Sequence, residues 1–357
     1  MTPAPRRAAS VALVLCASLA LAACNNAGTD DPGEDTTPTA TASGTKAVQP
    51  SATGTATTQP SASASSAAPS SPAVPASTIA NLDAITVDGA YGKEPKVTAK
   101  WPIAIAKTQV KVLSEGKGGK VAKGGTVVVN YAGINARTGK AFDSSFAKGG
   151  KPATFPLAQV IPGFRIGLEG QKVGSRVLIM MTPKDGYAEG NPQAGILKTD
   201  PLVFVVDIIQ GQLEGPEGAA VPPKAGLPTV KDNGKGKAPT ITTKGATIPK
   251  ELTSQLLIKG TGPAVKKDDG IVVNYTVVGA KDGKVLAENY STGAEAGMLN
   301  ALIPGWQKGL VNQPAGSRVL LVVPPADGYP KGNATPSIPA NETLVYVIDI
   351  LFASAAN

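Results

Sequence analysis

Residues 159–187 read QVIPGFRIGLEGQKVGSRVLIMMTPKDGY, and residues 301–329 read ALIPGWQKGLVNQPAGSRVLLVVPPADGY. The two stretches have the same length, lie 142 positions apart and agree at 15 of 29 positions. In each stretch, a short segment with glycines on either side of its apolar residues predicts one short helix, and the SRVL segment that follows predicts a β-strand. The aromatic residue in the helix differs, with Phe164 in the first stretch and Trp306 in the second. The chain therefore contains one pattern twice, in two copies that have diverged.

Strand-like segments rich in Val, Ile, Thr and Tyr surround the helix in both copies. They are residues 84–89, 96–101, 108–116, 125–133, 175–183 and 202–210 in the first copy, and residues 228–244, 253–260, 270–279, 317–324 and 343–352 in the second. Strands, one short helix and further strands predict an α+β fold in which an antiparallel sheet packs one helix. The segment 78–108 and its counterpart 228–248 predict additional N-terminal strands in each copy.

The repeat also predicts the domain boundaries. We assign the first domain to residues 78–212, a linker rich in Pro and Gly to residues 213–225, and the second domain to residues 226–357. A repeating unit of about 140 residues has the size of a domain, and it is larger than the unit of about 20–50 residues that builds a solenoid.

The composition excludes several kinds of catalytic and metal site. The 357 residues contain no histidine and only two cysteines, Cys16 and Cys24. A Ser-His-Asp or Cys-His site and a histidine-ligated zinc are therefore impossible, and the rest of the chain cannot form a disulfide framework. No metal or organic cofactor is suggested. Nucleic acid is not an expected partner, because no arginine cluster alternates with aromatic residues.

The formal net charge of +8 comes mostly from lysines scattered among Gly and Asp. This pattern is typical of a solvated surface. Attraction to anionic wall polymers or lipid headgroups is the alternative interpretation.

The N-terminus has the pattern of an export signal. Residues 1–10 carry positive charge, and residues 11–23 are apolar but too few to span a bilayer, which takes about 20 residues. The sequence LAAC at residues 21–24 resembles the lipobox of bacterial lipoproteins. The resemblance implies removal of residues 1–23, attachment of lipid to the Cys24 sulfur, and a location at the outer face of the cytoplasmic membrane. The alternative is an ordinary signal-peptidase site that leaves Cys24 as a free thiol.

Residues 24–77 consist largely of Thr, Ser, Ala, Pro and Gly and contain almost no bulky apolar residue. Such a segment cannot bury enough surface to fold, so it predicts a disordered tether. About 50 residues of flexible coil reach roughly 40 Å, enough to lift a folded domain off a membrane.

Six blocks of the first copy then identify a known family. They are VVVNYAG, GKAFDSSF, FPLAQVIPGF, GSRVLIMMTPKDGY, GNPQAGI and LVFVVDII. In this order and spacing they resemble the FKBP-type peptidyl-prolyl cis-trans isomerases, over about residues 110–210 in the first copy and 255–352 in the second. The resemblance implies a twisted antiparallel sheet wrapped around one short helix, and isomerisation of X-Pro bonds as the activity.

The implied chemistry suits a site that has no histidine, cysteine or metal. An X-Pro bond turns slowly because amide resonance opposes twisting, with a barrier of about 18–20 kcal/mol. The twisted transition state has lost that resonance and is less charge-separated than the planar amide. An apolar pocket therefore favours the twisted form by differential binding, and no nucleophile is needed.

The family's pocket residues are assigned to the first copy one at a time. The resemblance implies that the Tyr131 ring forms one wall, and that Phe142 and Asp143 contact the proline ring and polarise the region near the amide. It also implies that the backbone N–H of Ile161 and the hydroxyl of Tyr187 donate to substrate carbonyl groups. The remaining apolar wall and floor residues are Phe155, Val160, Phe164, Ile196 and Phe204. The alternative for each is a purely structural role, in the core or in a turn.

The first copy departs from the family pattern at two positions. Phe164 stands where most members have a tryptophan floor, and Ala153 stands where many have a phenylalanine. Macrolide ligands such as tacrolimus or rapamycin are implied by the resemblance, and Ala153 and Phe164, together with Leu286 in the second copy, would each weaken their binding.

The second copy keeps the apolar pocket but not the acid. Its assigned pocket residues are Tyr275, Leu286, Leu302, Ile303, Trp306, Tyr329, Ile338 and Tyr346. Ala287 stands where the first copy has Asp143, and Glu288 is shifted by one residue, toward the other side of a strand. We therefore predict a second pocket that binds prolyl peptides yet isomerises them poorly.

Two functions from different classes remain open. The first is a prolyl isomerase that acts on unfolded exported proteins and assists their folding, which X-Pro isomerisation can limit. The second is a non-catalytic, chaperone-like module whose two pockets hold a prolyl peptide or an unfolded chain with avidity. Asp143 discriminates between them, because its loss should lower turnover more than affinity only in an enzyme. A β-sandwich adhesin on a Thr/Pro-rich stalk is a third interpretation, but it does not explain the IPGF, IPGW and DGY blocks.

Overall fold

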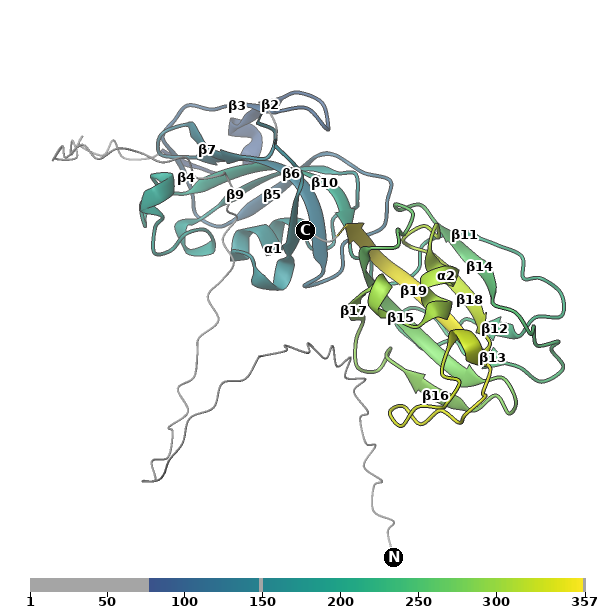
Figure 1. Cartoon of the computed structure of the whole chain (residues 1–357). Coiled ribbons are helices and arrows are strands. Elements are labelled where there is room, and N and C mark those ends of the chain that lie inside the picture. The colour runs from purple at the N-terminus through teal and green to yellow at the C-terminus, as the bar shows by residue number, and fades with distance from the viewer. Residues whose placement is uncertain (1–76, 148–149, 356–357) are drawn as a thin grey trace, which may run out of the picture.

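The computed structural model describes residues 77–147 and 150–355, which form two β-rich domains (Figure 1). The predicted signal peptide at residues 1–23, the lipidation site Cys24 and the predicted tether up to residue 76 lie outside the described residues, and these assignments stay predictions. In the part of the chain that the structure describes, no helix combines the length and apolar character that a bilayer crossing requires.

The first domain is a six-stranded antiparallel sheet with one α-helix on one face. The strand order is β5-β9-β10-β6-β7, and β8 pairs with β6 beside β7. The elements are β5 (Gln109–Ser114), β6 (Thr126–Asn135), β7 (Lys140–Ser144), β8 (Ala153–Pro156), α1 (Pro162–Leu168), β9 (Arg176–Met181) and β10 (Leu202–Gly211). The 3-10 turns of this half are Leu82–Ala84, Leu157–Gln159, Pro183–Asp185 and Pro192–Ala194.

The second domain repeats this arrangement with one strand more. Its order is β11-β14-β18-β19-β15-β16, and β17 pairs with β15. The elements are β11 (Gly218–Ala220), β14 (Thr253–Gly260), β15 (Asp269–Gly279), β16 (Val285–Glu288), β17 (Glu295–Met298), α2 (Pro304–Leu310), β18 (Arg318–Val323) and β19 (Leu344–Ala355), with 3-10 turns at Leu299–Ala301 and Pro325–Asp327. The predicted α+β fold, a sheet around one short helix in each copy, is confirmed.

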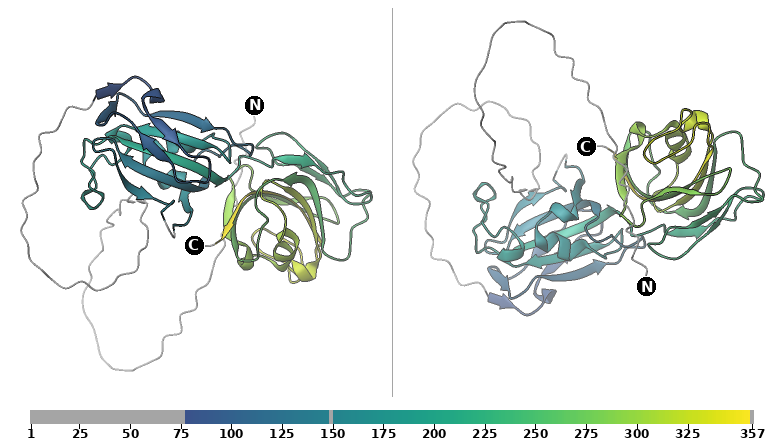
Figure 2. Two further views of the ribbon diagram at one scale, coloured as in Figure 1. Left: turned by 90° about the horizontal axis from the view of Figure 1, so that it is seen from above. Right: turned by 90° about the horizontal axis from the view of Figure 1, so that it is seen from below.

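The segment between the domains is more structured than its composition indicates. Part of the predicted linker 213–225 forms β11, which pairs with β14 at the edge of the second sheet. The Leu213 N–H donates to the carbonyl of Leu351 near the end of β19 (3.0 Å). Figure 2 shows the junction between the two domains from above and below.

Side chains alternate between the two faces of each sheet, and each face has its own core. On β9, Val177 and Ile179 face the helix, whereas Leu178 faces the opposite side. On β18, Val319 faces the helix and Leu320 does not. We term the two sides the helix face and the back face.

The predicted additional N-terminal strands are present, but they cover the back face instead of extending the main sheets. They are β1 (Ser77–Ile79), β2 (Thr86–Asp88), β3 (Lys96–Thr98) and β4 (Ile103–Ile105) in the first domain, and β12 (Thr229–Lys231) and β13 (Thr240–Thr242) in the second. They form the separate two-stranded sheets β1-β4, β2-β3 and β12-β13. The physical reason is apolar burial, because Leu82 and Ile103 pack on Met180 of β9, and Ile241 packs on Leu320 of β18.

A buried ion pair recurs on the back face of both domains. Arg176 donates to the two carboxylate oxygens of Asp207 at 2.6 and 2.8 Å, and Arg318 donates to Asp349 at the same two distances. Arg176 also donates to the carbonyl of Gly89 in the covering segment (2.7 Å). The bidentate geometry satisfies both buried charges and links the covering segment to the sheet.

Glycines let each helix lie directly on its sheet. A Cβ atom on Gly163 would lie 2.7 Å from Cε of Met181, and one on Gly167 would overlap the Ile179 side chain. The equivalent glycines of α2 face β18 just as closely. The spacing PGxxxGL in the two stretches therefore sets the distance between helix and sheet.

Replacing Gly309 by alanine should destabilise the second domain, because the added methyl group overlaps Leu321. We expect a loss of about 1–3 kcal/mol of unfolding free energy, although alanine is the better helix former. Gly215→Ala is the control, since a Cβ there meets no atom within 4 Å. Urea unfolding followed by circular dichroism measures both, and an unchanged midpoint for Gly309→Ala would contradict the close-contact explanation.

Candidate functional site

Five aromatic side chains of the first domain meet on the helix face. Tyr131 comes from β6, Phe142 from β7, Phe155 from β8, Phe164 from α1 and Phe204 from β10. The ring centroids of neighbouring pairs lie 4.7–6.4 Å apart, and the closest pair, Phe164 and Phe204, packs edge to face. Edge-to-face contacts stabilise such clusters beyond the area they bury. The fold thus gathers aromatic residues from five elements around one site.

Asp143 adds a carboxylate to this aromatic site. The Tyr131 hydroxyl donates to Oδ2 of Asp143 at 2.6 Å. Burial raises the pKa of the Tyr131 phenol, and the hydrogen bond to Asp143 raises it further. Burial, together with the negative charge of Asp143, also raises the pKa of Tyr187 to about 12. Both phenols therefore keep their protons and remain hydrogen-bond donors at neutral pH.

The other predicted residues lie around the same cluster. Ile196 is buried in the core of the helix face, and Val160, Ile161 and Tyr187 are half-buried and pack against it. Ile161 directly precedes α1, and its carbonyl accepts from the Phe164 N–H at 3.0 Å. The N–H of Ile161 has no acceptor within residues 77–147 and 150–355. All ten residues assigned to the first pocket thus lie together, with one backbone donor available to a ligand.

A β-bulge and a glycine determine the position of Phe142. The register between β6 and β7 shifts next to the pair Gly133–Asp143, so Phe142 is the unpaired residue of the bulge. A Cβ atom on Gly133 would lie 2.7 Å from Cζ of Phe142 and 2.8 Å from Cε1 of Phe204. Phe142 therefore fits here because residue 133 has no side chain.

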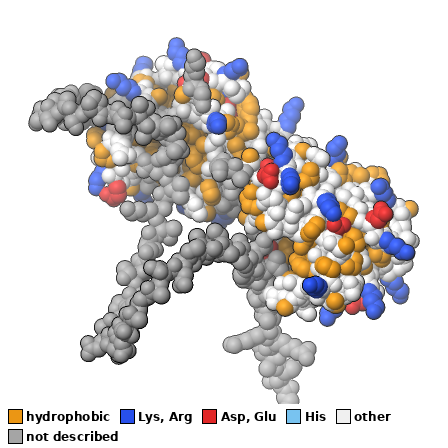
Figure 3. All heavy atoms as spheres, in the orientation of Figure 1, with side chains coloured by type: hydrophobic (Ala, Val, Ile, Leu, Met, Phe, Trp, Pro, Cys, Tyr) orange, Lys and Arg blue, Asp and Glu red, His pale blue; other side chains and the backbone are white. Residues whose placement is uncertain are grey.

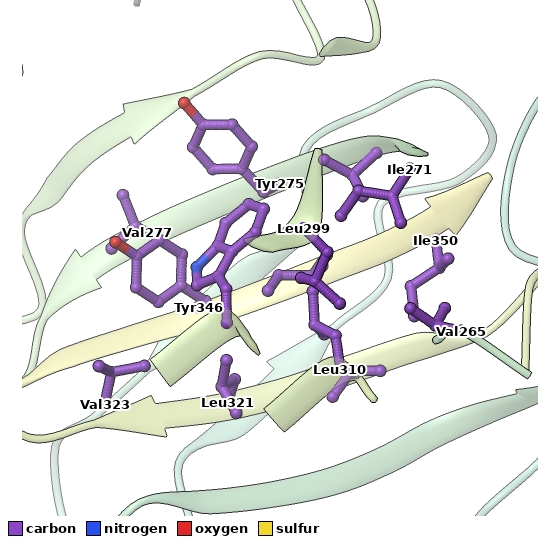
Figure 4. Close-up of a cluster of buried hydrophobic side chains, with 14 of the residues drawn as sticks. Val265, Ile271, Tyr275, Val277, Leu299, Leu310, Leu321, Val323, Tyr346 and Ile350 are labelled. Carbon is purple, nitrogen blue, oxygen red and sulfur yellow. The ribbon is translucent and has the colours of Figure 1, made fainter. Parts of the chain in front are cut away.

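The helix face of the second domain contains a cavity of about 150 Å³. Seven of the eight residues assigned from the sequence line it, namely Tyr275, Leu302, Ile303, Trp306, Tyr329, Ile338 and Tyr346. The Trp306 ring packs edge-on against Tyr275 and Tyr346, with centroids 5.5 and 5.4 Å away. Figure 4 shows the underlying core, in which the Tyr275 hydroxyl points away from the packed side chains. In Figure 3, hydrophobic side chains gather on the exposed surface of this domain, with charged side chains around them.

Leu286 is the exception, because it packs against the core without lining the cavity. Like Phe142, it is the unpaired residue of a bulge, next to the pair Val277–Ala287. Val277 occupies the position of Gly133, and its side chain fills space on the helix face. A smaller residue at position 286 and a larger one at position 277 have thus replaced the glycine–phenylalanine pair. Ala287 lines the cavity at the place of the first domain's acid.

Two positions on β17 shape this cavity and were missed in the sequence. Gly297 lines the cavity where the first domain has Phe155, and Glu295 lines it where the first domain has Ala153. The equivalence follows from the pairing of β17 with β15 and of β8 with β6. The offset of 142 residues between the copies, applied to Phe155 and Ala153, could have identified both positions from the sequence.

Comparison with known proteins identifies the family. The sequence profile of FKBP-type peptidyl-prolyl cis-trans isomerase matches residues 117–209 and 262–351, together just over half of the chain. The chain belongs to this FKBP family. The profile matches both copies, so the interpretation of the repeat as two FKBP domains is confirmed.

Individual relatives show the extent of the similarity. FkpA of Escherichia coli K12, an FKBP-type isomerase, is 39% identical over 103 residues, which are 28% of this chain and 37% of FkpA. A probable FK506-binding protein of Corynebacterium glutamicum is 37% identical over 97 residues, 26% of this chain and 78% of that protein. The crystal structure of FkpA from Escherichia coli aligns with 30% of this chain and 49% of its own, with 38% identity and a TM-score of 0.28. The chain therefore matches less than half of the length of FkpA.

In the second FKBP domain, positions 277 and 286 should be energetically coupled. Leu286→Phe alone should cost about 1–3 kcal/mol of unfolding free energy, because Val277 occupies the space that the ring needs. Combined with Val277→Gly, the same change should cost at least about 1 kcal/mol less than the sum of the single changes. Urea unfolding of the four proteins gives this coupling energy.

Val278→Ala supplies the control for this cycle. Val278 follows Val277 on β15, but its side chain lies on the back face. The loss of unfolding free energy from Val278→Ala should therefore add to that from Leu286→Phe within about 0.5 kcal/mol. If the unfolding free energies also add for Val277→Gly combined with Leu286→Phe, Val277 does not determine which residue fits at position 286.

Proposed function

We propose that the first domain catalyses cis-trans isomerisation of X-Pro peptide bonds. The observation that carries the proposal is the 2.6 Å hydrogen bond from Tyr131 to Asp143 beside the rings of Phe142, Phe164 and Phe204. An apolar aromatic site suits a proline ring, which has no N–H to satisfy. A carboxylate held at the wall of that site acts on the polar amide next to the ring.

In this proposal, catalysis is differential binding without a covalent step. The planar amide is the more charge-separated form, so apolar surroundings favour the twisted transition state over it. The free N–H of Ile161 and the protonated Tyr187 hydroxyl donate to substrate carbonyl groups and hold the peptide while one bond turns. A thousandfold acceleration requires only about 4 kcal/mol, which a few such contacts supply.

We propose that the second domain binds prolyl peptides and isomerises them weakly. Its cavity is mostly apolar and has the aromatic floor residue Trp306, which supports binding, whereas Ala287 at the position of Asp143 supports weak turnover. Two pockets in one chain would raise the affinity for an unfolded protein that contains several prolines, by avidity. A non-catalytic bivalent binding module is the second candidate function, and Ala287 at the position of Asp143 favours it for the second domain.

Asp143→Ala in the full chain should lower kcat/KM for isomerisation of a Leu-Pro peptide by about tenfold or more, while the peptide Kd changes less than about threefold. The reason is that the substitution removes the carboxylate and leaves the aromatic wall. Exchange spectroscopy by NMR measures the rate, and titration of the same peptide measures Kd.

Ser144→Ala is the matched control, since Ser144 is the next residue on β7 and, among the described residues, its hydroxyl accepts only from the Phe146 N–H (3.1 Å). It should leave both quantities unchanged. If Asp143→Ala turns over the peptide as fast as the wild type, the carboxylate is not catalytic. If the wild type binds the peptide and does not accelerate exchange, the chain is a binding module.

We further propose that the protein is lipid-anchored at the outer face of the cytoplasmic membrane and acts on unfolded exported proteins. The support comes from the sequence of residues 1–23, the LAAC segment at 21–24 and the tether-like composition of residues 24–77. A tether of that length would let the two domains reach chains that emerge near the membrane surface.

Cys24→Ser should abolish incorporation of radioactive fatty acid into the protein and should release it from the membrane fraction. Cys16→Ser is the matched control, because Cys16 lies in the segment that would be removed, and it should leave labelling unchanged. Metabolic labelling in the producing bacterium tests both, and labelling that survives Cys24→Ser would contradict the lipidation site.

A further inference from the structure

Glu295 brings a carboxylate into the second pocket. It lies on β17 directly opposite Val273 of β15, and Val273 belongs to the core of the helix face. Directly opposed residues of an antiparallel pair share one face of the sheet, so Glu295 faces the cavity. Among the described residues that line the cavity, Glu295 is the only charged one.

The Glu295 carboxylate has no partner among the described residues. Within residues 77–147 and 150–355, no hydrogen bond and no ion pair reaches it, although the side chain is half-buried. Burial raises the pKa of this carboxyl group, since the cavity supplies nothing that stabilises its charge. The nearby Glu288, by contrast, accepts from the hydroxyl and the N–H of Ser291.

Glu295 does not replace the acid of the first pocket. Asp143 pairs with Gly133, two residues after Tyr131, whereas Glu295 pairs with Val273, two residues before Tyr275. The two acids therefore lie at opposite ends of their pockets, about 13 Å apart along equivalent strands. The Tyr275 hydroxyl also makes no hydrogen bond to Glu295, unlike the bond from Tyr131 to Asp143. The second carboxylate thus meets a different part of a bound peptide.

We infer that the second pocket selects peptides in which a lysine or arginine is adjacent to the proline, with the cation paired to Glu295. This inference rests on the proposed binding of prolyl peptides by this domain. The proline ring packs on Trp306, and Gly297 leaves open the space that a phenylalanine fills in the first domain. A long basic side chain suits this space, because its methylene stem covers apolar wall while its charged end reaches the carboxylate. An acidic neighbour is disfavoured by repulsion.

The two tryptophans of the chain provide a specific probe. Trp306 lines the second pocket, whereas Trp101 packs on the back face of the first domain. The full chain labelled with ¹⁵N in tryptophan gives one indole signal for each, and the Trp306 signal reports occupation of the second pocket alone. The probes are capped peptides with lysine, norleucine or glutamate directly before or directly after proline. Norleucine keeps the apolar stem of lysine and lacks its charge.

We expect at least one lysine peptide to bind about five- to tenfold tighter than its norleucine counterpart, and the glutamate peptides to bind most weakly. Glu295→Gln should remove the preference for lysine and leave the norleucine Kd unchanged. Glu288→Gln, which removes the same charge from the other face of the sheet, should preserve the preference for lysine.

Equal Kd values for lysine and norleucine peptides in the wild type would overturn the selectivity and leave the proposed peptide binding intact. A Glu295→Gln variant that still prefers lysine over norleucine peptides would likewise overturn the selectivity and leave the proposed peptide binding intact. If none of the peptides shifts the Trp306 signal, the proposed binding function of the second domain fails, and the selectivity fails with it.

Discussion

The helix–sheet contact is the constraint on which the rest of each domain depends. Gly163 and Gly167 let the backbone of α1 lie directly on the Met181 and Ile179 side chains of β9, and this contact determines the depth at which Phe164 enters the core. The same contact recurs beneath Trp306 in α2. Because the backbone distance is fixed and packed cores relax little, each change of side-chain volume on the helix face changes the volume of the pocket.

The back face explains why the helix face could diverge. The pair Arg176–Asp207 and its counterpart Arg318–Asp349 have the same geometry, and both lie beneath a covering segment. Unpairing either buried charge would be costly, so this face tolerates little change. A sheet with an independent core on its back face can lose or gain pocket residues on the other face and still fold. The back face of each sheet thus contributes mainly to stability, whereas the helix face of the same strands holds the residues of the proposed pocket.

The sequence predicted the features that depend on local spacing. The helix at residues 162–168 and the main strands follow from the spacing of apolar residues along the chain. The aromatic cluster follows from the sequence blocks that resemble the family. It could not predict features that depend on pairing between distant strands. The bulge at Leu286, the position of Glu295 opposite Val273 and the separate sheets on the back face all depend on a pairing register that the sequence of one strand does not specify.

The two pockets differ by exchanges that follow from this geometry. The first site has Phe155 packed edge to face on the smaller floor residue Phe164, whereas the second combines a tryptophan floor with Gly297 around a cavity. The position of the acid differs as well: Asp143 pairs two residues after Tyr131, whereas Glu295 pairs two residues before Tyr275. The hydrogen bond from Tyr131 holds the Asp143 carboxylate in place, as the proposed catalytic role requires. Glu295, which has no partner among the described residues, would gain most from a ligand that brings its own cation. The proposed division of roles, isomerisation in the first domain and selection of peptides in the second, therefore needs only side-chain exchanges on one face of a duplicated fold.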